Sequence, residues 1–144
     1  MTVKELFVEA MRRIDAGDLE GFVAMQAPDC TWITPSGELH GRDEVREYLR
    51  PWQAGFPNER RHVLHRIAEV DGTIYCEGVF RGVNEGAMET PEGTLPATGR
   101  SVALRFAHAV DIDVEARHAT SVRLYQDQLD LLGQLGLLPA PAAS

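Results

Sequence analysis

His108 is the residue of this 144-residue chain whose type and position point most directly to chemistry. It shares alternate positions with Val102, Leu104 and Phe106, so an imidazole interrupts the apolar face of an expected strand. Imidazole exchanges protons near neutral pH, and burial would lower its pKa because burial disfavours the charged form. We therefore expect His108 to be a general acid or base. The alternative is a histidine that is hydrogen-bonded for packing alone.

Aromatic and hydroxyl side chains could form the walls of a pocket around this histidine. Trp32 and Thr34 share one face of a short expected strand, and Tyr48 and Trp52 share one face of an expected helix. A tyrosine hydroxyl can donate to a substrate oxygen, whereas Trp32 is expected to serve as pocket wall. Aromatic residues at helical spacing are also typical of an ordinary core.

Four polar residues of the expected strands are further candidates. Arg123 and Tyr125 alternate on the last strand: facing inward, Arg123 could bind an anionic or enolate oxygen, and facing outward it would be a charge on a dimer surface. The sequence leaves both orientations open, because a single bulge reverses which side chains face inward. Glu77 and Asp111 are the acids that could assist His108, although an acid on a strand is usually solvated.

Composition excludes several function classes. The chain has 14 basic and 22 acidic residues, a net charge of −8, which makes nucleic acid and anionic membrane surfaces poor partners. No apolar stretch approaches the roughly 20 residues of a membrane span. The N-terminal segment has Glu5 and Glu9 on a helical pattern, unlike a secretory signal, and a cytoplasmic location is expected.

The sequence also lacks the motifs of metal and cofactor sites. The five histidines show no ligand spacing, Cys30 and Cys76 do not form a disulfide framework, and no glycine-rich phosphate loop follows a strand. We therefore expect no metal and no cofactor.

The periodicity predicts helices before strands in a single domain over residues 1–138, with a tail over 139–144. Pro51 is expected to kink or end the third helix, and Asp71-Gly72 is expected to close a tight hairpin. A long curved sheet wrapped around three helices would enclose a cavity, and the fold class is α+β. The expected helices cover 3–14, 19–27 and 42–53, the strands 30–34, 61–70, 73–83, 99–113 and 117–126, and a helical turn follows 127.

The chain resembles the nuclear transport factor 2-like superfamily and, within it, the SnoaL-like polyketide cyclase (ester cyclase) family. The resemblance implies a cone-shaped curved antiparallel or mixed sheet, a pocket without metal or organic cofactor, and a homodimer formed through the convex sheet face. It is carried by Gly41–Val45, Leu49–Pro57, the Pro-Ala-Thr-Gly-Arg sequence at 96–100, Tyr125–Leu129 and the Gln-Leu-Gly ending at 134–136.

The resemblance also implies a chemistry, which this chain matches in part. The cyclases of this family use an aspartate on the last strand, assisted by a histidine on the preceding strand, to promote an intramolecular aldol ring closure. His108 falls at the histidine position, but Leu124 falls at the aspartate position. The related ketosteroid isomerases place a base before a proline on the first strand, where this chain has Thr34. Neither catalytic base is matched.

Three functions are consistent with these observations. The first is an enzyme resembling cyclases, isomerases or lyases that applies acid/base chemistry to an apolar, oxygenated small molecule, with Tyr48 or Arg123 stabilising an oxyanion. The second is a binding module that has lost the catalytic aspartate, which Leu124 favours. The third is an oligomerisation domain with a filled cone. An acid within hydrogen-bond reach of His108 would favour the enzyme, and a wholly apolar cavity around it would favour the binding module.

Overall fold

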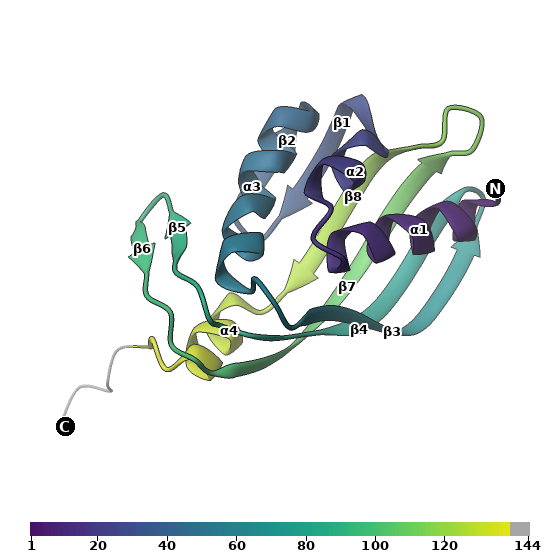
Figure 1. Ribbon diagram of the computed structural model, residues 1–144. Helices are drawn as coiled ribbons and strands as arrows, with labels where there is room; N and C mark the ends of the chain where they lie inside the picture. The colour runs from purple at the N-terminus through teal and green to yellow at the C-terminus, as the bar shows by residue number, and fades with distance from the viewer. Residues whose placement is uncertain (139–144) are drawn as a thin grey trace.

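In the computed structural model, which describes residues 1–138, three helices lie against the concave face of a curved sheet (Figure 1). A fourth helix closes one end of the sheet, and a small two-stranded ribbon stands beside the third helix. The helices are α1 (Val3–Asp15), α2 (Leu19–Ala24), α3 (Gly41–Gly55) and α4 (Gln128–Leu135). The strands are β1 (Gln26–Thr34), β2 (Gly37–His40), β3 (Arg60–Val70), β4 (Thr73–Val83), β5 (Met88–Thr90), β6 (Gly93–Leu95), β7 (Ser101–Asp113) and β8 (His118–Gln126).

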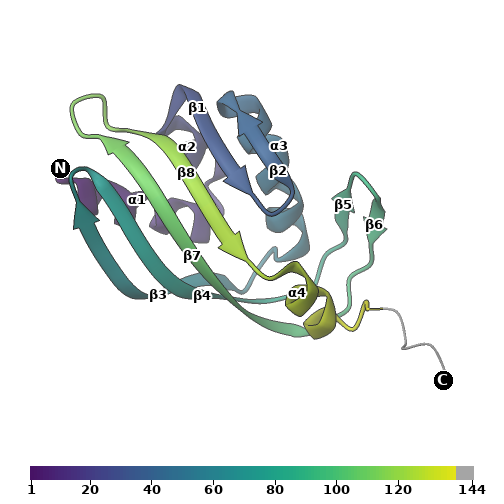
Figure 2. The ribbon, with the colours of Figure 1, turned by 180° about the vertical axis from the view of Figure 1, so that it is seen from behind.

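The main sheet is mixed. Its strand order is β2-β1-β8-β7-β4-β3, with β1 parallel to β8 and every other neighbouring pair antiparallel. Figure 2 shows the outer face of this sheet, which no helix covers apart from α4 at its end. The expected α+β architecture, a curved mixed sheet around helices from the N-terminal half, is confirmed. The expected tail over 139–144 lies outside the described residues.

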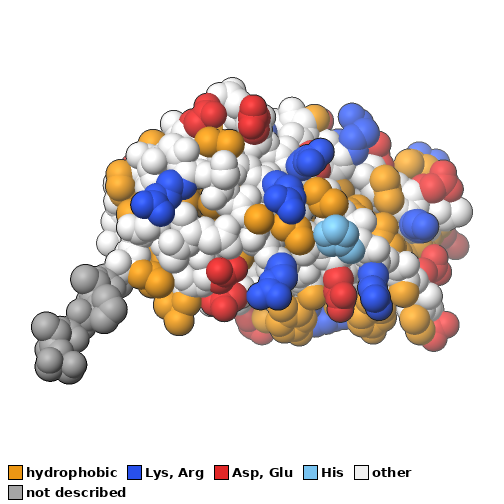
Figure 3. All heavy atoms as spheres, turned by 90° about the horizontal axis from the view of Figure 1, so that it is seen from below, with side chains coloured by type: hydrophobic (Ala, Val, Ile, Leu, Met, Phe, Trp, Pro, Cys, Tyr) orange, Lys and Arg blue, Asp and Glu red, His pale blue; other side chains and the backbone are white. Residues whose placement is uncertain are grey.

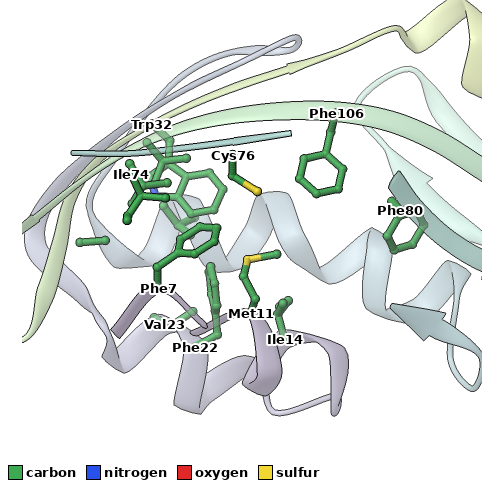
Figure 4. Close-up of a cluster of buried hydrophobic side chains, with 14 of the residues drawn as sticks. Phe7, Met11, Ile14, Phe22, Val23, Trp32, Ile74, Cys76, Phe80 and Phe106 are labelled. Carbon is green, nitrogen blue, oxygen red and sulfur yellow. The ribbon is translucent and has the colours of Figure 1, made fainter. Parts of the chain in front are cut away.

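Helix α1 lies across the sheet with its apolar stripe facing inward. A capping box, in which Thr2 and Glu5 each accept from the other's backbone N–H, satisfies two free donors at the helix start. The helix buries Leu6, Phe7, Met11 and Ile14. Figure 4 shows Phe7 and Met11 projecting from α1 toward Ile74, Cys76 and Phe106 of the sheet.

The β3–β4 hairpin forms as expected, with Asp71 and Gly72 both at positive φ, 51° and 84°. A bulge in β3 shifts the register between Leu64 and Arg66. It reverses the inward face of the strand, so Ile67 rather than Arg66 pairs with the inward-facing Cys76. Before the bulge, His62 pairs with Phe80, and both side chains face the helices.

Two prolines lie inside regular elements. Pro51 does not end α3 early: the helix continues to Gly55, with Trp52 packed against Phe56 and Phe80 beyond the proline. This packing outweighs the single backbone hydrogen bond that proline removes. Strand β1 begins at Gln26 and includes Pro28, where the pairing with β8 is irregular, so the missing N–H of this proline disrupts no regular ladder.

Charges are mixed over the side of the molecule on which β3 and β4 lie. Figure 3 shows Lys and Arg, Asp and Glu, and hydrophobic side chains interspersed on this side, with a histidine among them. The acidic excess of the chain is therefore not gathered here. None of the described helices has the length and hydropathy needed to cross a membrane.

Helix α4 extends the hydrogen bonding of β7 beyond the end of β8. The side-chain oxygen of Gln134 accepts from the Ala103 backbone N–H (2.7 Å), and its amide nitrogen donates to the Ala103 carbonyl (2.9 Å). Leu135 is buried beside it, and Gly136 ends the helix in the left-handed conformation. The Gln-Leu-Gly ending thus anchors the helix to the sheet.

Replacing Gln134 with Ala should lower the free energy of unfolding by about 1–3 kcal/mol, because it leaves both backbone groups of Ala103 without partners. Urea denaturation measures the change. Leu129→Ala is the matched control on the same helix, since Leu129 is 67% exposed. Equal stability of the two variants would show that Gln134 does not anchor α4.

Candidate functional site

A cavity lies between the concave face of the sheet and helices α1 to α3. Its volume, counted as the space open to the centre of a water molecule, is about 100 Å³. Most of its wall is apolar and aromatic, including Phe7, Met11, Phe22, Trp32 and Phe106. The polar side chains that line it are Tyr48, Gln53, His62, His108 and Gln126. An apolar cavity with few polar groups is the usual form of a small-molecule site.

His108 projects into this cavity from β7. Its cross-strand neighbours are Cys76 on β4 and Leu124 on β8, and its ring packs against Phe106 at a centroid distance of 4.6 Å. The side chain is half-buried: it is surrounded by other residues of the protein, and it forms part of the cavity wall. No hydrogen bond to either ring nitrogen is formed by any group within residues 1–138.

The electrostatics of the cavity keep His108 neutral. Burial, and secondarily the repulsion that a protonated His62 would exert, lower the pKa of His108 to about 3. A neutral imidazole carries one N–H donor and one nitrogen acceptor. His108 can therefore hydrogen-bond to an oxygen of a bound molecule, but it does not carry a positive charge near neutral pH.

A second histidine, which the sequence analysis did not identify, lines the same cavity. Nδ1 of His62 lies 2.6 Å from Oδ1 of Asp15, the last residue of α1. The backbone N–H of His62 donates to the other oxygen of that carboxylate (2.9 Å). Because the carboxylate accepts from Nδ1–H, Nε2 is left as a proton acceptor. Asp15 itself does not line the cavity, so it positions His62 from behind.

Phe106 contacts both histidines. Its ring centroid lies 5.3 Å from that of His62 and 4.6 Å from that of His108. Gly78 on the neighbouring strand makes this placement possible, because a Cβ atom there would lie 2.8 Å from the Phe106 ring. The two imidazoles are thus held along one wall of one cavity.

The hydroxyl of Tyr48 is a buried polar group without a hydrogen-bond partner in the described part of the chain. Burial raises the pKa of Tyr48 to about 12, although the nearby side chains of Thr34 and Trp52 offset part of the rise. Neither neighbour is placed to form a hydrogen bond of normal geometry with it. Tyr48 therefore stays protonated and has a hydroxyl to offer to a ligand.

The structure divides the expected site residues into two groups. Six of them line the cavity: Trp32, Tyr48, Trp52, Phe106, His108 and Leu124. Thr34 does not, because its hydroxyl donates to the Gly37 carbonyl and accepts from Ser36 at the end of β1.

Arg123, Tyr125, Glu77 and Asp111 lie outside the cavity, which corrects the expectation that any of them could serve there. Leu124 faces inward, so its two neighbours in β8 face outward. Arg123 pairs with Asp111 at 3.2 Å, and Tyr125 is 58% exposed. Glu77 is exposed on the same outer face. Within residues 1–138, no carboxylate therefore lies beside His108, and the acid of the site is Asp15.

The spacing of Asp15 in the sequence could have indicated that its side chain faces the sheet. Asp15 follows Met11 by four residues, so it extends the buried face of α1. Its partner His62 could not be assigned an inward orientation, because the bulge at 64–66 makes the alternation of β3 ambiguous. Among the described residues, no group of three or more His, Cys, Asp or Glu side chains is arranged to hold a metal ion.

The charge state of His108 has a measurable effect on stability. Between its ordinary pKa near 6.5 and the folded value of about 3, the unfolded chain binds a proton that the folded chain does not. Stability should therefore fall on acidification through this range, with a slope of up to about 1.4 kcal/mol per pH unit from this residue. His108→Gln should lose that contribution in urea denaturation from pH 7 to 4.

The matched control is His65→Gln, since His65 lies on the exposed outer face. Its stability should run parallel to that of the unsubstituted protein over the same range. If the His108→Gln curve also runs parallel, His108 is not buried as described.

Comparison with known proteins agrees with this architecture. A family profile described as "SnoaL-like domain" matches residues 7–117. Among curated proteins no match is found. Many solved structures share the fold.

Three of these structures illustrate the range of similarity. AclR from Streptomyces galilaeus, described as a candidate hydroxylase, has a TM-score of 0.79 at 16% identity, covering 95% of this chain and 97% of that one. A candidate polyketide cyclase from Xanthomonas campestris has a TM-score of 0.74 at 21% identity, covering 92% and 96%. A protein with a ketosteroid isomerase-like fold from Catenulispora acidiphila, in complex with trimethylamine, has a TM-score of 0.74 at 17% identity, covering 95% and 96%. At these identities the structures establish the fold, and the profile match over residues 7–117 shows that the chain belongs to the SnoaL-like domain family of the nuclear transport factor 2-like superfamily.

Proposed function

We propose that this protein is an enzyme that applies general acid/base catalysis to a small, largely apolar, oxygenated molecule held in the cavity. The observation that carries the proposal is the hydrogen-bonded pair of His62 and Asp15 at the wall of that cavity. An imidazole oriented by a carboxylate is a recurring arrangement for proton transfer in enzymes.

His62 is the group proposed to move the proton. Its Nε2 accepts a proton from a carbon or hydroxyl of the substrate, and the Asp15 carboxylate stabilises the imidazolium that forms. The proton then returns to another position of the substrate. Return to a different carbon gives an isomerisation, and return to an oxygen after carbon–carbon bond formation gives a ring closure.

His108 and Tyr48 are the proposed partners of the substrate oxygen. Both are neutral hydrogen-bond donors, because burial lowers the pKa of His108 to about 3 and raises that of Tyr48 to about 12. Donors fixed in an apolar cavity stabilise negative charge as it develops on a carbonyl oxygen. This assignment changes the expected role of His108, from proton transfer to hydrogen bonding.

A non-catalytic binding module is the alternative. Leu124 lies directly opposite His108 in the sheet, so the pair of aspartate and histidine associated with the family's cyclases is not formed there. If His62 and Asp15 only bind an oxygen of the ligand, the cavity would bind without turnover.

A homodimer through the outer sheet face belongs to the same proposal. That face exposes apolar surface on Ile33, Tyr75 and Tyr125, from three different strands. Exposed apolar residues gathered on one face are typical of protein interfaces.

Exchange of the α-protons of 1-indanone and 2-tetralone for deuterium, followed by proton NMR, tests the catalytic proposal without knowledge of the natural substrate. The unsubstituted protein should accelerate exchange, and His62→Gln should reduce the enzyme-dependent rate by about 10²-fold or more. Asp15→Asn should reduce it as well, because asparagine has no negative charge to stabilise the imidazolium and its amide can accept only one of the two hydrogen bonds that Asp15 accepts from His62.

The control for this experiment is His65→Gln, because His65 is an exposed histidine of the same strand. This variant should catalyse exchange of the ketone protons at the same rate as the unsubstituted protein. Ketones that bind the protein while exchanging only at the rate of buffer would favour the binding module instead.

A further inference from the structure

A second, larger hollow opens on the outside of α3. This outer groove lies between α3, the β5–β6 ribbon and α4, which stand next to one another in Figure 1, and its volume is about 740 Å³. Its apolar surface comes from Leu39, Pro51, Trp52, Met88, Leu95 and Leu131. The volume falls within the range of about 300–1,000 Å³ typical of small-molecule pockets.

The outer groove adjoins the cavity. Tyr48 and Trp52 line both spaces, one turn apart on α3. The side chain of Tyr48, whose hydroxyl is buried and without a partner in the described chain, therefore forms part of the wall between the two spaces. A molecule that occupies both spaces would therefore contact both of these side chains.

The charge of the outer groove is entirely acidic. Among the described residues, no Lys, Arg or His lines it, whereas five acidic residues do: Asp43, Glu44, Glu47, Glu89 and Glu92. Asp43 is paired with Arg46 at 2.7 Å, and Glu47 is paired with Arg50. Within residues 1–138, the remaining three carboxylates have no cationic partner; Glu44 accepts from a backbone N–H, and Glu89 accepts from Thr94.

We propose that the outer groove binds a positively charged, amine-bearing arm of an amphipathic substrate whose apolar end enters the cavity. The unpaired carboxylates Glu44, Glu89 and Glu92 attract the ammonium group, and the apolar surface between them covers the rest of the arm. An anionic molecule would be repelled from the same groove. The substrate of the enzyme proposed above would therefore be an amphipathic amine. Binding of the amine follows from the groove alone, whereas the reaction at the apolar end rests on the proposed function.

Three isosteric probes test the charge preference directly: 2-(2-naphthyl)ethylamine, 2-(2-naphthyl)ethanol and 2-naphthylacetate. Isothermal titration calorimetry at low salt should show the amine binding about 10-fold more tightly than the alcohol, and the carboxylate binding most weakly. Each exposed charge pair contributes a factor of about 1.5–5, so three together account for this preference. Added salt should reduce it.

A triple variant, Glu44→Gln with Glu89→Gln and Glu92→Gln, should lower the affinity for the amine to that for the alcohol, which should not change. The matched control is Glu69→Gln with Glu77→Gln and Glu115→Gln, which alters net charge equally at exposed positions outside the groove. This control should keep the amine preference.

A cavity variant shows whether the apolar end enters the cavity. Ala10→Leu adds side-chain volume to the cavity wall and should weaken the amine and the alcohol to the same extent. Unchanged affinity in this variant would contradict the entry of the naphthyl group.

The proposal is overturned if the amine binds no more tightly than the alcohol, if none of the three probes binds, or if the groove triple variant keeps the preference. These outcomes do not depend on catalysis, since His62→Gln should leave the ratio of amine to alcohol affinity unchanged. Loss of proton exchange with an intact amine preference would therefore contradict the proposed catalysis and support the proposed groove.

Discussion

The hydrogen bonds between Asp15 and His62 are the interaction on which the site depends. They join the last residue of α1 to the third residue of β3, 47 positions along the chain, through both the ring and the backbone of the histidine. A polar group at the wall of an apolar cavity costs stability when it lacks a hydrogen-bond partner, and Asp15 and His62 satisfy each other. The same bonds engage Nδ1 of His62 and leave Nε2 as the ring nitrogen without a partner in the described residues. The Asp15–His62 hydrogen bonds thus determine both where the His62 ring lies and which of its nitrogens is available for proton transfer.

The sheet supplies the rest of the geometry. A bulge after Leu64 allows β3 to present His62 inward before it and Ile67 inward after it. The regular ladder between β7 and β8 places Leu124 opposite His108, and Gly78 leaves room for the Phe106 ring between the two histidines. Strand curvature leaves a hollow, and the helices cover it with aromatic side chains (Figure 4). The result is a largely apolar space with two imidazoles, a tyrosine and two glutamines in its wall, which suits a substrate with few oxygens.

The sequence predicted those parts of the site that follow from regular alternation. Strand β7 has no irregularity at His108, whose side chain faces the cavity as its alternation with Val102, Leu104 and Phe106 implied. Leu124 on β8 also faces the cavity, at the position that the family resemblance assigned to it. Arg123 had no such support from its sequence, and its outward direction follows only from the register seen in the structure. Asp15 and His62 come from elements distant in sequence, and a bulge obscured the parity of β3. The outer groove depends on the short β5–β6 ribbon, in a stretch where glycine and proline gave no periodic signal.

Long-range nitrogen-15 NMR spectra of the histidine side chains test the central claim most directly, because they report which ring nitrogen carries the proton. The account predicts that at pH 8 His62 is protonated on Nδ1 alone, and that Asp15→Asn changes its tautomer or ring environment while leaving the His108 signals in place. His62 protonated on Nε2, or unaffected by the loss of the Asp15 carboxylate, would contradict the account.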